Sequence, residues 1–333
     1  MVFGGIMAGL ILLCALVPFL GIFMPVPIVL VYVRYGGRTA VLTAIISALL
    51  TTMFIGPVQA FLMTVPMGIL PGLAFGYGFR NKLRPLLIVV IATVTFFAGW
   101  TANFAVTKTL VLGGRDPIAD AMESEAVKDQ WEQLFASVEK IGEQQQPANE
   151  QQAQAKEKNL AVIREFKNNP TGVFWTLLPA SLLIGGLFNS WLNYMFCRAT
   201  LPRFGHDVPA PTPFSRFILP AWSAWLFVPS LAGYLYFANA GLNVPWWVKV
   251  IQNVALPVVF AFFVYGLAVV YGYLRIKQEM GKLPSVLMAV VPLFLLGATA
   301  PFMYAVIGSM DTVLDLRGLG HGIWKLRPPE ETP

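Results

Sequence analysis

Long apolar runs constrain this chain more than any other feature. They recur from Met1 to Ile307, and one polar stretch, Lys108 to Pro170, interrupts them. A helix of about 20 apolar residues crosses a hydrocarbon core about 30 Å thick. The runs lie at about 1–17, 24–33, 39–54, 59–78, 85–106, 171–196, 218–237, 247–274 and 283–307. The sequence therefore predicts an all-α membrane protein, a polytopic helical bundle of eight or nine transmembrane segments.

Composition agrees with this class. Hydrophobic residues make up 56% of the chain and charged residues only 12%, whereas soluble domains are roughly a quarter charged. A net charge of +6 would suggest a nucleic-acid partner in a soluble chain, but here it indicates Lys and Arg in short cytoplasmic loops. We therefore expect contact with the lipid bilayer, no nucleic-acid partner, and a multi-pass location in a bacterial cytoplasmic (inner) membrane.

Prolines break the second apolar run. The stretch Pro18 to Arg38 also contains Pro25 and Pro27. Each proline lacks a backbone N–H and clashes with the preceding helical turn. A backbone group freed in this way inside hydrocarbon must find a partner in the protein or in water. We expect a short second helix that begins near Met24 and packs inside the bundle.

The polar stretch divides the expected architecture into four parts. They are an amino-terminal transmembrane bundle (1–107), an extracytoplasmic helical hairpin (108–170), carboxy-terminal transmembrane helices (171–310) and a polar tail (311–333). Asp116 followed by Pro117 predicts a helix start, and Asn168-Asn169-Pro170 predicts the end of the returning helix. The hairpin is either a structural cap or an arm that docks a partner.

Positive charge assigns the loops to one side of the membrane. If the first 33 residues cross twice, the basic loops all share the cytoplasmic face. Their residues are Arg34, Arg38, Arg80, Lys82, Arg84, Arg198, Arg203, Arg216, Arg275, Lys277 and Lys282. A single crossing there would move only the amino terminus. On this count the tail residues Arg317, Lys325 and Arg327 fall outside, where positive charge is disfavoured.

The sequence gives no support for catalysis. No Asp or Glu precedes Asp116, and none falls inside a predicted membrane segment. The chain has neither a G-x-x-x-x-G-K-[ST] phosphate loop nor an H-E-x-x-H metal motif. Cys14 and Cys197 lie in or beside different segments, so we expect no disulfide. The prediction is a protein that is not an enzyme and has no metal or other cofactor.

Uncharged polar and aromatic residues gather in the outer half of the predicted bundle. They are Gln59, Trp100, Thr101, Asn103, Trp247, Gln252 and Asn253. A cluster of amides and indoles suits a small polar organic molecule, and we take these residues as a candidate substrate-binding set. The alternative is an ordinary interfacial belt with hydrated amides. Asn189 and Asn193, one helical turn apart, are expected to form interhelical hydrogen bonds.

Two further patterns could serve a partner. Gly68, Gly72 and Gly76 are spaced by four, as are Gly5 and Gly9, and small residues at this spacing let helices approach closely in lipid. They indicate either packing within the chain or docking of another membrane subunit. In the tail, Asp311 and Asp315 share a helix face and would repel each other unless a cation or Arg317 lies between them. This motif is either a salt-linked helix end or a contact for a ligand or partner.

The chain resembles the YybS-like family of predicted bacterial membrane proteins. The likeness lies in the opening helix, the MPVPIVLVYVRYGG stretch, the Gly-rich fourth segment and the closing MDTVLDLR. The amino-terminal half is also similar to the S components of energy-coupling factor vitamin transporters. That resemblance implies that Gly5 and Gly9 dock a transmembrane coupling subunit with ATPases. It also implies that the outer polar cluster is the substrate pocket.

These observations favour a substrate-binding or permease-type subunit for a small organic solute, which depends on a partner for energy. The alternative is a non-transporting membrane scaffold or envelope-associated interaction protein, whose hairpin and glycine stripes bind other membrane proteins. A membrane-embedded enzyme is a third class, and no residue in the sequence supports it.

Overall fold

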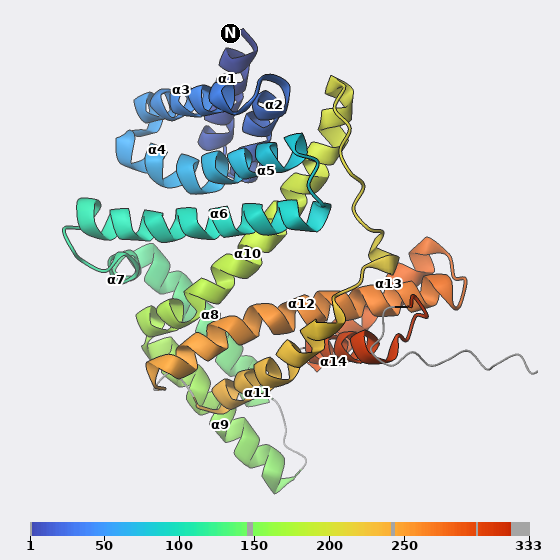
Figure 1. Ribbon diagram of the computed structural model, residues 1–333. Coiled ribbons are helices and arrows are strands. Elements are labelled where there is room, and N and C mark those ends of the chain that lie inside the picture. The colour runs from blue at the N-terminus through green and yellow to red at the C-terminus, as the bar shows by residue number, and fades with distance from the viewer. Residues whose placement is uncertain (1, 145–148, 241–243, 298, 321–333) are drawn as a thin grey trace, which may run out of the picture. The chain divides into compact units, whose positions relative to one another are not determined.

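The computed structural model describes residues 2–144, 149–240, 244–297 and 299–320, and its elements there are helices (Figure 1). Their contacts group the chain into a first unit, Met1–Pro211, and a second unit, Thr212–Pro333. Within the described residues, five helical stretches are long and apolar enough to cross a membrane: Gly37–Ile55, Ala60–Arg80, Pro85–Val111, Pro170–Phe204 and Trp246–Ile276. Val2–Leu16, Leu20–Tyr35 and Lys282–Leu295 are shorter apolar helices. The chain is therefore a helical membrane protein.

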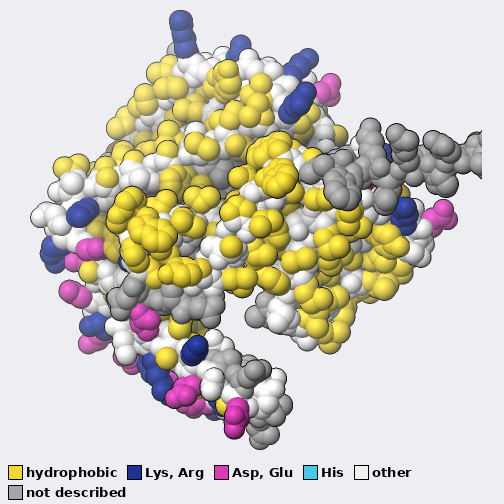
Figure 2. Space-filling model, turned by 60° about the horizontal axis from the view of Figure 1, so that its bottom comes forward, with side chains coloured by type: hydrophobic (Ala, Val, Ile, Leu, Met, Phe, Trp, Pro, Cys, Tyr) yellow, Lys and Arg dark blue, Asp and Glu magenta, His cyan; other side chains and the backbone are white. Residues whose placement is uncertain are grey.

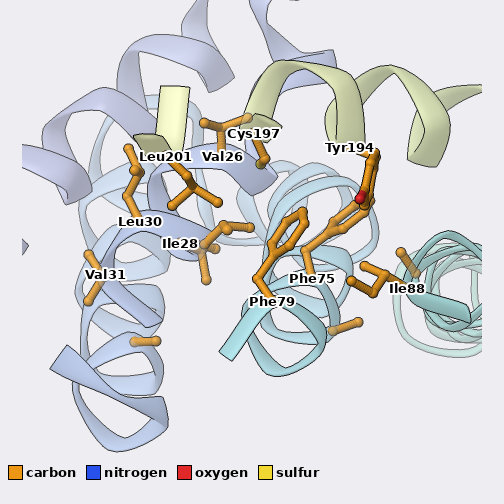
Figure 3. Packing of buried hydrophobic residues seen from close by; sticks show 14 of the residues in the cluster. Val26, Ile28, Leu30, Val31, Phe75, Phe79, Ile88, Tyr194, Cys197 and Leu201 are labelled. Atoms are coloured by element: carbon orange, nitrogen blue, oxygen red, sulfur yellow. The ribbon is translucent and has the colours of Figure 1, made fainter. Parts of the chain in front are cut away.

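The first unit opens with the proline-broken helix that the sequence predicts. Helix α1 (Val2–Leu16) is followed by a 3-10 turn (Pro18–Phe23) and by the short helix α2 (Pro25–Tyr35). Figure 3 shows α2 side chains packed against aromatic rings from neighbouring helices. The core there includes Val26, Ile28, Val31, Phe75, Phe79, Ile88, Tyr194, Cys197 and Leu201, all buried. The prediction of a short second helix sheltered inside the bundle is confirmed.

Five further helices complete the membrane part of the first unit. Helix α3 (Gly37–Ile55) leads through Gly56 into α4 (Pro57–Thr64), a π turn (Val65–Ile69) and α5 (Leu70–Arg80). The next helix, α6 (Pro85–Val106), continues as a π turn (Thr107–Val111). Helix α10 (Pro170–Thr200) returns after the polar stretch and packs against α6. The π turn at Val65–Ile69 contains Pro66, so it lies where proline interrupts the helical hydrogen bonds.

The described part of the polar stretch contains three α-helices. They are α7 (Pro117–Met122), α8 (Glu125–Gln144) and α9 (Glu150–Asn168). Helices α8 and α9 pack together, with Arg164 Nε 2.7 Å from Glu139 Oε1. In Figure 2, acidic and basic side chains mix over the lower part of the view, and hydrophobic side chains cover much of the visible face. The helix that the sequence predicts to begin at Asp116-Pro117 is interrupted near Glu123, between α7 and α8.

Asp116 caps α7 as predicted, since its Oδ1 accepts from the backbone N–H groups of Ile118 and Ala119. Trp175 Nε1 donates to Asp116 Oδ2 at 2.6 Å. Partial burial acts to raise the pKa of Asp116, but the hydrogen bonds outweigh it and hold the pKa below the usual value. Because the folded-state pKa is lowered, the carboxylate stabilises α7 above the unfolded-state pKa. That stabilisation disappears as the pH falls through the folded-state pKa.

Asp116→Ala is therefore expected to weaken α7 by about 1 kcal/mol at neutral pH. The difference from wild type should shrink below about pH 4, where the wild-type carboxylate is also becoming protonated. Amide hydrogen exchange of the α7 backbone in the full chain measures this local stability. Asp120→Ala is the matched control, because Asp120 pairs with Arg115 at an exposed site. A difference that does not change with pH would contradict the account.

The second unit is built around α12 (Trp246–Ile276), which packs against α11 (Ala224–Ala240) and α14 (Thr299–Leu314). Helix α13 (Lys282–Leu295) precedes α14. The prediction of one helix over 283–307 is wrong, because the chain turns after Leu295 and Gly297 adopts a positive φ of 55°. Tyr304 Oη donates to Ala289 O at 2.6 Å, so α14 folds back along α13.

This fold-back changes the expected place of the tail. Arg317 Nη1 donates to the carbonyl oxygen of Ser215 at 3.0 Å. Arg317 and Arg216 therefore lie at the same end of the second unit, whereas a single helix over 283–307 would carry Arg317 to the opposite side of the membrane. Arg317 therefore shares the membrane side of Arg216, for which the positive-charge rule predicts the cytoplasm. Lys325 and Arg327 lie outside the described residues.

Candidate functional site

An asparagine in α6 compensates for the proline in the fourth segment. Pro66 has no N–H to donate to the carbonyl of Leu62, four residues earlier. Asn103 Nδ2 donates to that carbonyl at 2.7 Å, and Asn103 Oδ1 accepts from Thr107 Oγ1 at 3.2 Å. Both polar ends of the Asn103 amide, a candidate substrate-binding group, are thus engaged within the chain.

An asparagine in α10 likewise donates to a carbonyl that a proline leaves unpaired, here in the proline-broken opening of the chain. In the 3-10 turn, the carbonyl of Ile22 faces Pro25 three residues on, and Pro25 has no N–H. Asn193 Nδ2 donates to Ile22 O at 2.9 Å, and it also contacts Asn189 O at 2.9 Å and Asn189 Oδ1 at 3.0 Å. The expected interhelical hydrogen bond of Asn193 is confirmed, and protein satisfies this backbone group.

A groove in the first unit lies beside these two proline-interrupted turns. Its volume is about 310 Å³, at the small end of the range of about 300–1,000 Å³ for ligand pockets. The wall comes from both interrupted segments and from α6 and α10. The lining residues are Ile22, Met67, Phe96, Trp100, Ser181, Leu182, Gly185, Phe188 and Asn189. Of the candidate substrate-binding residues, Trp100 lines this groove.

Two side-chain donors of the groove-lining residues make no hydrogen bond within the described residues. Trp100 Nε1 is buried without a hydrogen-bond partner in the described part of the chain. Asn189 accepts from Asn193 through its carbonyl and its Oδ1, and its own Nδ2 donates no hydrogen bond within the same part. The lining residues include no Asp, Glu, Lys, Arg or His. The groove can therefore hold a molecule through apolar contacts and neutral donors, and it offers no acid or base.

The other candidate binding residues have separate surroundings. Thr101 is exposed and its Oγ1 donates to Phe97 O at 2.9 Å, while the side chain of Gln59 lies outside the described part of the structure. In the second unit, Trp247 lines an apolar groove of about 610 Å³ between α11 and α12. Gln252 is 2% exposed and its Oε1 has no partner among the described residues. Asn253 Nδ2 donates to Lys249 O at 2.8 Å.

The two glycine stripes differ in what faces them. A Cβ added at Gly68 or Gly72 would crowd Met24 or Ile28, and one at Gly76 would overlap Tyr32. This stripe is therefore used for packing against α2 within the chain. Gly5 and Gly9 on α1 are different, since an added Cβ there meets no atom within 4 Å.

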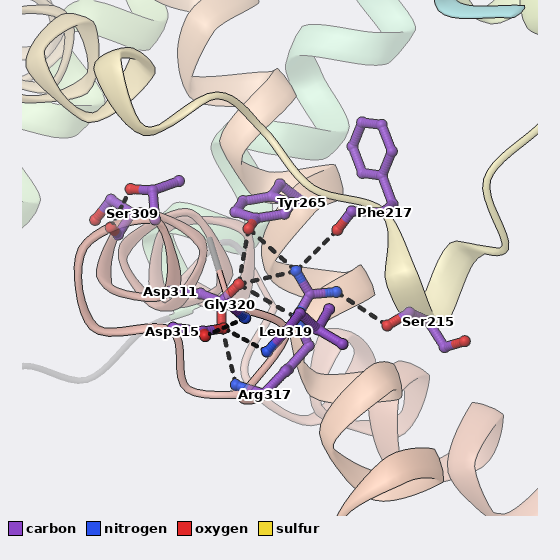
Figure 4. A network of polar contacts seen from close by, with 10 residues as sticks. Ser215, Phe217, Tyr265, Ser309, Asp311, Asp315, Arg317, Leu319 and Gly320 are labelled. Atoms are coloured by element: carbon purple, nitrogen blue, oxygen red, sulfur yellow. Dashed lines mark hydrogen bonds and ion pairs between the residues drawn. The ribbon is translucent and has the colours of Figure 1, made fainter. Parts of the chain in front are cut away.

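The tail motif forms a buried polar network in the second unit (Figure 4). Arg317 Nη2 lies 2.8 Å from Asp311 Oδ2, and neither side chain is exposed. Tyr265 Oη donates to the same oxygen at 2.7 Å, and Arg317 also donates to the carbonyl of Phe217. Asp315 turns away with a positive φ, and its carboxylate accepts from the N–H groups of Leu319 and Gly320. The motif is a salt-linked helix end, and Arg317 pairs with Asp311.

Sequence reasoning missed Met67, Ser181 and Gly185 as groove residues. Met67 lies in a π turn next to Pro66, and a proline inside an apolar run was the available signal. Ser181 and Gly185 are small residues in α10 that no motif distinguishes. Among the described residues, no group of three His, Cys, Asp or Glu side chains could hold a metal ion.

The chain is similar to known sequences over most of its length. A family model described as "Predicted membrane protein (DUF2232)" matches residues 5–312. A relative described as "Uncharacterized protein YybS", from Bacillus subtilis (strain 168), is 24% identical over 317 residues. That alignment covers 92% of this chain and 90% of the relative. No solved structure matches the chain.

Proposed function

The chain belongs to the family of predicted membrane proteins described as DUF2232, and from this premise we propose that it is a substrate-binding subunit for a small organic solute. The observation that carries the proposal is the groove of the first unit. Its mostly apolar lining includes Trp100, whose Nε1 is buried without a hydrogen-bond partner among the described residues, and Asn189, whose half-buried side chain donates no hydrogen bond there. A buried N–H group is usually paired, and a bound solute would supply the acceptor that Trp100 Nε1 lacks.

The proposed membrane arrangement follows the charges. The chain crosses a bacterial cytoplasmic membrane several times, its basic loops lie in the cytoplasm, and the α8–α9 hairpin lies outside. The positive-inside rule supports this orientation. The fold-back of α14 supports a cytoplasmic place for Arg317, beside Arg216.

Dependence on a partner is the second part of the proposal. The sequence has no phosphate-binding loop that would let the chain power itself. The stripe of Gly5 and Gly9 is open in the first unit, and small residues at this spacing suit close helix docking in lipid. The sequence pattern that resembles S components leads us to propose a transmembrane coupling subunit with ATPases as the partner.

Two glycine substitutions separate solute binding from partner docking. Gly185 lines the groove, and an added Cβ there meets no atom within 4 Å. Gly185→Leu should therefore fill the groove without disturbing the fold. Gly9→Leu should block docking on α1 and leave the groove open. Both replace a helical glycine in open space and raise helix propensity, so each variant is the control for the other.

The test is co-purification from membranes of the bacterium that makes the protein. Mass spectrometry would report both the bound small molecule and any partner subunit. We expect Gly185→Leu to lose the small molecule and keep the partner, and Gly9→Leu to do the reverse. Equal solute content in wild type and Gly185→Leu would contradict solute binding in this groove. An unchanged partner in Gly9→Leu would contradict docking on α1.

One observation favours the scaffold alternative. Leu134, Val138 and Ile141 form a stripe on α8, and their exposed fractions are 55%, 38% and 61%. Apolar side chains exposed together on a polar hairpin are typical of a protein contact. A scaffold should lose the partners that bind the hairpin when residues 116–168 are deleted. A transport subunit should keep its coupling partner in that deletion and lose it in Gly9→Leu.

A further inference from the structure

The groove of the first unit restricts the charge of its ligand. No charged or histidine side chain lies among its lining residues. An ion in a largely apolar site without a counter-charge carries a large desolvation cost. An uncharged ligand avoids that cost, so the wall favours a neutral molecule.

The same groove specifies a hydrogen-bond acceptor on the ligand. Trp100 on α6 and Asn189 on α10 both line the groove. Trp100 Nε1 is buried without a partner among the described residues, and Asn189 Nδ2 donates no hydrogen bond within them. Indole offers only a donor, and the Asn189 amide oxygen is already occupied by Asn193. A carbonyl, ester or ether oxygen would meet this need, whereas a pure hydrocarbon would not.

The groove opens along α10, within the membrane-spanning stretch Pro170–Phe204. Phe188 lines it and is 66% exposed, and Gly185 is also exposed. A side chain exposed in the middle of a spanning helix faces lipid or another membrane protein. A neutral, mostly apolar ligand dissolves in lipid, so the exposed rim offers it a direct route.

We propose that the groove binds an uncharged, largely apolar molecule that carries a carbonyl-type acceptor and enters from the bilayer. This inference rests on the proposed function and adds the ligand class and its route. The apolar wall holds the body of the molecule, and the Trp100 and Asn189 N–H groups bind its acceptor. The groove volume of about 310 Å³ selects a single-chain molecule over a whole diacyl lipid.

Three radiolabelled probes of similar length test the ligand class. They are methyl decanoate, which is a neutral ester, decanoate, which is its anion, and undecane, which has no acceptor. The full chain is reconstituted in vesicles of ether-linked phosphatidylcholine, so that the bilayer brings no ester carbonyl. We expect saturable binding of methyl decanoate, at least tenfold weaker binding of decanoate, and only non-saturable partitioning of undecane.

Substitutions then connect binding to the groove. Trp100→Phe keeps an aromatic ring and removes the N–H, and it should weaken ester binding about three- to tenfold, as the loss of one hydrogen bond implies. Gly185→Leu should abolish saturable binding. Trp225→Phe is the control, because Trp225 is 74% exposed on α11 in the second unit, and it should bind as wild type does.

Undecane binding as tight as the ester, or tighter binding of decanoate, would overturn the ligand class. An ester affinity that Trp100→Phe and Trp225→Phe leave equally unchanged would overturn the role of the Trp100 N–H. None of these results bears on the proposed function, which is decided separately by the solute that co-purifies with wild type and not with Gly185→Leu.

Discussion

Gly266→Ala is expected to lower the free energy of unfolding by about 3 kcal/mol or more, because the second unit has no room for the added methyl group. Gly266 on α12 faces Tyr304 on α14, and its Cβ would overlap the backbone carbonyl of Tyr304. Backbone atoms cannot rotate aside as a flexible side chain can. Gly308 makes the reciprocal contact, 2.6 Å from an added Cβ to Phe262 O. The two helices must therefore separate to accept alanine.

The measurement is reversible unfolding of the purified full chain in mixed micelles, followed by helical circular dichroism. Gly185→Ala is the matched control, since Gly185 is also helical and an added Cβ there meets no atom within 4 Å. The control should equal wild type or gain up to about 1 kcal/mol from helix propensity. A Gly266→Ala protein within about 1 kcal/mol of wild type would contradict the close approach of α12 and α14.

Arg317→Met is expected to have an effect of similar size. The variant leaves the carboxylate of Asp311 buried without its cation, and removing one member of a buried pair costs about 3–5 kcal/mol. It also removes the hydrogen bonds to the carbonyls of Ser215 and Phe217, which join the start of the second unit to α14. The same unfolding experiment gives the loss, and a cysteine introduced at Ser215 should become more reactive toward a water-soluble maleimide.

Two comparisons isolate the ion pair. Arg216→Met, at an exposed arginine of the same end of the second unit, should change stability by less than about 0.5 kcal/mol. The double variant Asp311→Leu with Arg317→Met should recover much of the loss, because no unpaired charge remains buried. If Arg317→Met unfolded like wild type, the buried network would not stabilise this unit.

Membrane helices were the most predictable part of the fold. Lipid requires long apolar runs, so the composition identified the class, and the prolines at Pro25 and Pro27 identified the short second helix. The helical hairpin α13–α14 was not predicted, because hydropathy is the same for one long helix and for two short ones that turn in an apolar region. Gly297, with its positive φ, was the available local signal.

The candidate site was predictable only in part. Trp100 lines the groove, but Asn103 bonds the carbonyl that Pro66 leaves free. Sequence identifies an unpaired carbonyl and a buried amide separately, and only the packing of α6 against the fourth segment shows that they meet. Glycine spacing has the same limit. The stripe at Gly72 contacts α2 and the one at Gly9 is open, although both patterns look alike in the sequence.

The account depends most on the claim that the first-unit groove holds a small molecule. A cryo-electron microscopy map of the full chain in lipid nanodiscs tests this directly. We predict non-protein density in the groove, within about 3 Å of both Trp100 Nε1 and Asn189 Nδ2. A groove filled by protein side chains, with both N–H groups donating to acceptors of the chain itself, would contradict it.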